Sequence, residues 1–94
     1  MIKYRVPLVE LLAGLAEECC ELGQAALKLR RVYDRTNPTP ENTENAIKRF
    51  HEEVADVQLY LDQIDWSRIT VDEIKEEKLQ RWEERLNMAE RSGK

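Results

Sequence analysis

Residues 8–29 carry an apolar series at helical spacing in which one position is an acid. The apolar members of the series are Leu8, Leu11, Leu15, Leu22, Ala25 and Leu29. A period of this kind marks one face of an α-helix. Glu18 stands in the series where a further leucine would be expected. Because a carboxylate on a packed face is costly unless it is paired or bound to a metal, the series predicts a long helix with a functional acid on its inner face.

Two pairs of acids, each with a spacing of three residues, lie on either side of a turn-like segment. One pair is Glu18 and Glu21, the other is Glu53 and Asp56, and residues three apart share a helix face. Residues 34–40 between them are rich in Asp, Asn, Thr and Pro, as turns are. If the flanking helices are antiparallel, the numbers of facing residues add up to about 74. Glu18 then faces Asp56, and Glu21 faces Glu53.

Four carboxylates at one level, between helices about 8–10 Å apart, repel one another strongly. A divalent cation removes that repulsion, and hard ions such as Mg²⁺ and Mn²⁺ take oxygen ligands. The register therefore predicts a Mg²⁺ site, which Mn²⁺ can also occupy, held by these four acids. The alternative is an ordinary solvated helix face, because 36% of all residues in this chain are charged.

The whole chain is predicted to be all-α, a single domain over residues 1–94 with helices at about 7–33, 40–65 and 70–90. Thr39 suits the start of the second helix as its N-cap. The apolar stripe of that helix consists of Ile47, Phe50, Val54, Val57, Leu61 and Ile64. The run Thr70-Val71-Asp72-Glu73 has the capping-box form that begins a helix. The first two helices are expected to form a long antiparallel hairpin.

Three such helices make a thin bundle, and several apolar residues lack an obvious partner within one chain. Leu27, Leu59 and Trp66 are the clearest cases. We therefore expect a homo-oligomer, a dimer or a tetramer, that completes a four-helix bundle. The third helix also carries a basic stripe made of Lys75, Lys78, Arg81 and Arg85. The stripe either faces phosphates or pairs with acids of its own helix, as Glu77 would with Arg81.

Composition excludes several function classes. A net charge of −4 gives no reason to expect nucleic-acid binding, and no apolar run is long enough to span a membrane. The first residues lack the features of a signal peptide, so a cytoplasmic protein is expected. One His and two adjacent Cys supply neither a zinc site nor the Glu-x-x-His motifs of a di-iron bundle. Gly-rich phosphate loops and EF-hand spacing are also missing from the sequence.

The motif Glu17-Glu18-x-x-Glu21 followed by Glu53-x-x-Asp56 resembles the signature of the MazG-like all-α nucleoside triphosphate pyrophosphohydrolases. The resemblance covers nearly the whole chain, from about Leu8 to Leu86. It includes the runs ELGQA at 21–25, DVQLY at 56–60 and KEEKLQRWEERL at 75–86. The segment between the two acid pairs, residues 22–52, is longer than expected for the family, which bears on the substrate-facing loop.

The resemblance implies hydrolysis of a nucleoside triphosphate, with a standard or altered base and ribose or deoxyribose, to the monophosphate and pyrophosphate. It implies that the two acid pairs hold Mg²⁺ and that Glu17 orients or activates a water. Lys28, Lys78 and Arg81 become candidates for contacts with triphosphate oxygens. Tyr60 becomes a candidate for the base or sugar, and its alternative is an aromatic at the border of the core. The competing function class is a non-catalytic helical interaction module that keeps the fold.

Overall fold

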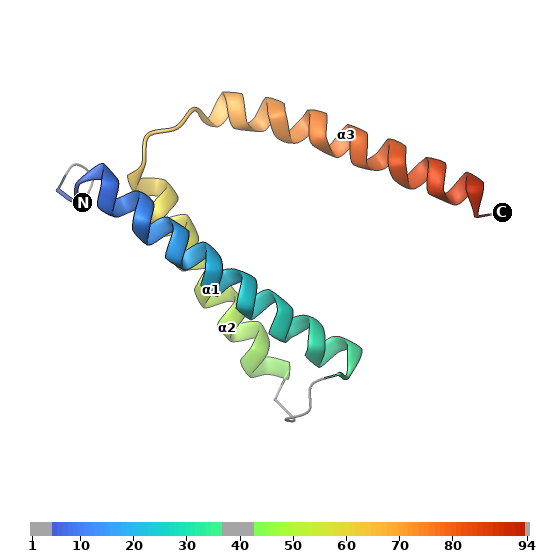
Figure 1. The fold of residues 1–94 in the computed structure, drawn as a ribbon, viewed down its shortest axis with the longest axis horizontal. Helices are drawn as coiled ribbons and strands as arrows, with labels where there is room; N and C mark the ends of the chain where they lie inside the picture. Colours follow the sequence, from blue (N-terminus) through green and yellow to red (C-terminus); the bar gives the residue numbers. More distant parts are fainter. Residues whose placement is uncertain (1–4, 37–42, 94) are drawn as a thin grey trace.

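The computed structural model describes residues 5–36 and 43–93, and it contains three helices and no strand within these ranges. They are α1 (Leu8–Asp34), α2 (Thr43–Gln63) and α3 (Arg68–Ser92). Figure 1 shows α1 and α2 side by side and antiparallel, with α3 projecting away from them. The predicted all-α fold and the helical hairpin are therefore confirmed. No described helix is both long enough and apolar enough to cross a membrane.

The predicted start of the third helix is wrong by two residues. The helix begins at Arg68, and its N-cap is Ser67, whose hydroxyl oxygen accepts a hydrogen bond of 3.1 Å from the backbone N–H of Thr70. Ser67 takes this place because a serine hydroxyl can satisfy one of the free N–H groups of the first turn. The capping box at Thr70–Glu73 is therefore not formed. The predicted N-cap of the second helix, Thr39, lies outside the described residues.

The α1–α2 hairpin is held by a thin core. Its buried apolar residues are Leu11, Ala25 and Ala46, and none of them is a large side chain that is fully buried. Gly14 permits a close approach of the two helices, because a β-carbon there would overlap the ring of Tyr60. Gly14 and Tyr60 add up to the predicted facing sum of about 74, so the antiparallel register is confirmed.

One flank of the hairpin is apolar and only partly covered. Its members on α1 and α2 are Leu8, Leu12, Leu15, Cys19, Leu22, Ala26, Ile47, Phe50, Val54 and Leu61, each half-buried or exposed. On α1, Cys19 lies about 200° round the helix from Glu17, whereas Leu15 and Leu22 share a face with Glu18, so the apolar flank borders the acid cluster. The single chain therefore leaves apolar area in water, and the predicted outward residues Leu27 and Leu59 are indeed exposed.

The third helix makes no packing contact with the hairpin among the described residues. All of α3 is exposed, including Leu79, Trp82 and Leu86. The connector before it is held locally: the indole N–H of Trp66 donates to the carbonyl of Leu61 at 2.8 Å, and the Arg68 guanidinium lies 5.3 Å from the centre of the Trp66 ring. Most helical stability in proteins comes from tertiary packing, and the described hairpin supplies none to α3.

Candidate metal centre

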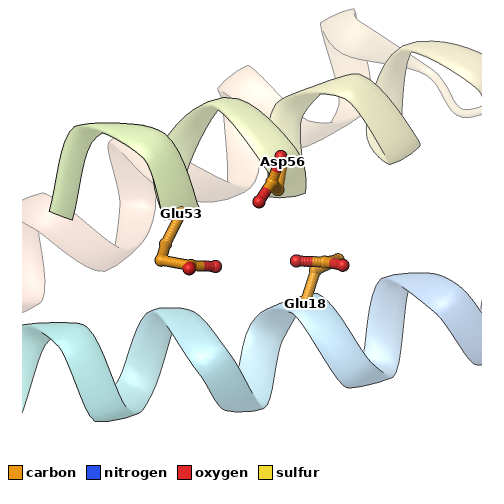
Figure 2. Close-up of side chains that lie close together, drawn as sticks. All are labelled: Glu18, Glu53 and Asp56. Atoms are coloured by element: carbon orange, nitrogen blue, oxygen red, sulfur yellow. The ribbon is translucent and has the colours of Figure 1, made fainter. Parts of the chain in front are cut away.

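Three acids from two helices converge at the middle of the hairpin. Glu18 on α1 and Glu53 and Asp56 on α2 each offer one carboxylate oxygen, and these oxygens all lie within 4.8 Å of one another. Figure 2 shows the three side chains in the space between the facing helices. The 3.6-residue period places Glu53 and Asp56 on adjacent turns of one face, and the register of the hairpin brings Glu18 opposite them.

These acids are placed where charge is costly. Glu53 is only 7% exposed, Glu18 is half-buried and Asp56 is exposed. Oε2 of Glu18 and Oε2 of Glu53 are both shielded from solvent and lack a hydrogen-bond partner. A buried acceptor without a partner is destabilising, because the water lost on burial is not replaced. The cluster therefore leaves two shielded carboxylate oxygens without a partner inside the described chain.

The electrostatics of the site agree with that reading. Burial raises the pKa of the Glu18 carboxyl above its ordinary value, and the charges of Glu21, Asp56 and Glu53 raise it further. Burial also raises the pKa of Glu53, with added repulsion from Glu21 and Asp56, while the Arg49 cation partly opposes the rise. Both shifts mean that the folded chain disfavours the charged carboxylates until positive charge is supplied.

Glu21 belongs to the cluster but is not one of its three mutually close members. It lies beside Glu53, near enough for a hydrogen bond between the two side chains to contribute to the raised pKa of Glu53. Two carboxyl groups can form such a bond only when they share a proton. Glu17, the outer acid of the first motif, is exposed and contributes repulsion to Glu18. The structure therefore brings three of the five predicted acids together, places Glu21 beside Glu53, and leaves Glu17 exposed next to Glu18.

The donor set fits a hard divalent cation. All donors are carboxylate oxygens, which such ions prefer. Oxygens on opposite sides of Mg²⁺ are separated by about twice the metal–oxygen distance of 2.0–2.1 Å, and for larger ions by more. The present limit of 4.8 Å exceeds the roughly 4.2 Å that opposite oxygens reach around Mg²⁺, so the carboxylates would close in by a few tenths of an ångström when they bind that ion.

The predicted substrate residues are distributed unevenly. Lys28 and Tyr60 lie on the hairpin, half-buried, on opposite sides of the acids along its length. Lys78 and Arg81 lie on α3, which makes no contact with α1 or α2 in the described chain, so the single chain does not bring them to the cluster. Figure 1 shows the separation of α3 from the hairpin.

One residue near the site was missed by sequence reasoning. Arg49 lies one turn before Glu53 on α2, and its positive charge opposes the rise in the pKa of Glu53. It also lines a hollow together with Lys28 and Arg31. The register rule could have found it, because residue numbers that add up to about 74 place Arg49 opposite Ala25. Ala25 lies on α1 between the first acid pair and Lys28.

No protein-family model, no curated protein and no solved structure matches this chain.

Proposed function

We propose that this chain is a Mg²⁺-dependent hydrolase that converts a nucleoside triphosphate to the monophosphate and pyrophosphate. The observation that carries the proposal is the buried carboxylate of Glu53, whose Oε2 lacks a partner and whose neighbours Glu18 and Asp56 are also acids. The likeness of the acid motifs to those of the MazG-like pyrophosphohydrolases gives the reaction class. Control of the nucleotide pool is the corresponding role.

In this proposal Glu18, Glu53 and Asp56 hold the metal, and Glu21 supports it from beside Glu53. When bound, the cation neutralises phosphate charge and lowers the pKa of a coordinated water. Glu17 is exposed and adjacent to the cluster, so its carboxylate can orient the attacking water and accept its proton. Water adds across the bond between the α- and β-phosphates, which yields the two products.

The proposed active form is a homo-oligomer, a dimer or a tetramer. Its support is the apolar flank of the hairpin, which a second hairpin would cover to give a four-helix bundle. The exposed apolar residues of α3, such as Leu79 and Trp82, would find partners in the same assembly. In such an assembly Lys78 and Arg81 would approach the acids of another copy. Their contact with the phosphates of the substrate stays a prediction.

The decisive experiment is release of pyrophosphate from a panel of standard and altered nucleoside triphosphates, with and without Mg²⁺ or Mn²⁺. We expect metal-dependent release that Glu53→Gln abolishes. The control is Glu52→Gln, which removes an exposed acid next to Glu53 in the sequence and should leave release unchanged. Failure of every nucleotide in the panel, with metal present and the fold intact, would reject the proposal.

A non-catalytic interaction module is the second candidate. The observation in its favour is α3, a helix of 25 residues whose side chains are all exposed and include large apolar ones. Such a module would bind a partner through α3 without any dependence on the acids. Pyrophosphate release that requires both Mg²⁺ and Glu53 separates the two candidates, because a binding module has no reason to show it.

A further inference from the structure

The face of the hairpin that carries the acids also carries a basic hollow. Its lining residues are Gln24, Ala25, Leu27, Lys28, Arg31 and Arg49. Three cations from two helices therefore surround one concavity in a chain whose net charge is −4. Lys28 is half-buried, which holds its side chain near the hairpin, whereas Arg31 and Arg49 are exposed at the rim.

The basic hollow adjoins the acids. Arg49 is four residues before Glu53 on the same helix, a spacing that puts the two side chains on one face, and its charge acts on Glu53. Lys28 is seven residues after Glu21 on α1, which is the same face two turns further on. Cations at this place are not explained by the metal site, because they would repel a metal ion rather than hold it.

A second hollow lies on the other side of the acids. Its floor and walls include Leu11, Gly14, Leu59 and Tyr60, with Glu17 at the edge nearest the metal cluster. The Tyr60 ring is spread across Gly14, where no side chain intervenes. Along the hairpin the order is therefore an aromatic and apolar hollow, then the carboxylates, then the basic hollow toward the turn.

We propose that the basic hollow formed by Lys28, Arg31 and Arg49 binds the two terminal phosphates of the substrate, so that the triphosphate lies lengthwise on the hairpin. This inference rests on the proposed function and adds the direction of the substrate. The phosphates point toward the turn, the bond to be cleaved lies over the acids, and the nucleoside lies toward Tyr60. Arg supplies several N–H donors that match phosphate oxygens, which makes Arg49 and Arg31 the main contacts.

The direction also explains the choice of products. A ligand whose terminal pair of phosphates is held in the basic hollow presents the bond between its α- and β-phosphates to the metal. Cleavage there leaves pyrophosphate among Lys28, Arg31 and Arg49 and the monophosphate on the side of Tyr60. A ligand laid in the opposite direction would set its phosphates beside Leu59 and Glu17, where desolvation and repulsion oppose binding.

The test is calorimetric binding of inorganic tripolyphosphate in a Mg²⁺ buffer. We expect Arg49→Gln and Arg31→Gln each to weaken binding by about tenfold, because each removes charge-assisted hydrogen bonds. Arg49→Lys should retain more of the affinity, since it keeps the charge. The affinity of the variants should also depend less on salt. The matched control is Arg30→Gln on α1, where the native side chain is 77% exposed and pairs with Asp34 instead.

Wild-type affinity in Arg49→Gln and Arg31→Gln, or a loss equal to that in Arg30→Gln, would overturn the inference. So would a loss confined to a Lys78→Gln, Arg81→Gln double variant. Circular dichroism shows that each variant is helical before it is compared. If tripolyphosphate binding depends on Arg49 but no nucleotide is hydrolysed, the subsite stands and the proposed function fails. If hydrolysis occurs and Arg49→Gln is indifferent, the function stands and the subsite fails.

Discussion

The ring of Tyr60 on α2 lies across Gly14 on α1, in the space that a β-carbon at position 14 would occupy. This contact fixes the distance and the register of the two helices one turn away from Glu18. The carboxylates of Glu18, Glu53 and Asp56 meet because the helices are this close. Gly14 is thus a structural requirement of the acid cluster as well as of the hairpin.

Gly14→Ala and Gly23→Ala form a matched pair for measuring that requirement. Both replace a glycine within α1, and alanine favours a helix by about 1 kcal/mol over glycine. A β-carbon at Gly23 meets nothing within 4 Å, so this variant should be stabilised. At Gly14 the Tyr60 ring must move, at a cost of about 1–3 kcal/mol. Urea unfolding of both variants should rank Gly14→Ala below Gly23→Ala, and equal stabilities would mean that the ring moves freely.

The hairpin could be predicted from the sequence because its signals are local. A helical period in the apolar residues sets the helices, and the turn composition with the two acid pairs sets the register. The same reasoning placed Glu18 opposite Asp56. These features depend on residue spacing within single helices and on one short connection between them. Both can be read from the order of residues in the sequence.

The N-cap of α3, the role of Arg49 and the position of α3 were not predicted. They depend on contacts between segments, which residue spacing within one helix does not reveal. Ser67 and Thr70 both suit a helix start, and only the three-dimensional connector decides between them. Arg49 resembles any solvated cation until the hairpin brings it beside Lys28. The position of α3 cannot be read from its apolar residues, since their partners are not in the hairpin of the same chain.

The apolar flank predicts that the chain associates with itself. Light scattering at micromolar concentration should give a mass of at least twice 11.1 kDa. Leu12 is 48% exposed on this flank, so Leu12→Glu should shift the population to monomer. Asn87→Glu adds the same charge at an exposed position on α3 and serves as the control. A wild-type chain that is both monomeric and active would contradict the proposed assembly.

The end of α1 predicts a pH-dependent contribution to stability. Hydrogen bonds from the hydroxyl and the backbone N–H of Thr36, at 2.6 and 3.0 Å, hold the pKa of Asp34 below its ordinary value of 3.8. A carboxylate with a lowered folded-state pKa stabilises the fold above the unfolded value, and that contribution is lost as pH falls through the folded value. NMR titration of Thr36→Ala, which removes only the hydroxyl, should show the Asp34 pKa rising, and an unchanged pKa would assign the effect to the retained backbone N–H at position 36 and to Arg30 and Arg31.

The central prediction concerns the response of the fold to metal. If Glu18, Glu53 and Asp56 repel one another until a cation binds, the wild type should gain stability on addition of Mg²⁺ or Mn²⁺. Mass action gives about 2.7 kcal/mol at a hundredfold excess over Kd. Asn87→Glu, which adds a charge away from the cluster, should gain the same amount. Thermal melts with and without metal measure the gain.

Glu53→Gln provides the test that distinguishes a metal site from a structural ion-pair network. Without metal the variant should be as stable as the wild type or more so, because a buried like charge and an unsatisfied carboxylate oxygen are both removed. It should also lose most of the gain on adding Mg²⁺. If Glu53 instead paired with a structural cation, its neutralisation would strand that partner and cost about 3–5 kcal/mol. A metal-free melt far below the wild type, together with a wild type indifferent to metal, would show that these acids serve the fold rather than a metal.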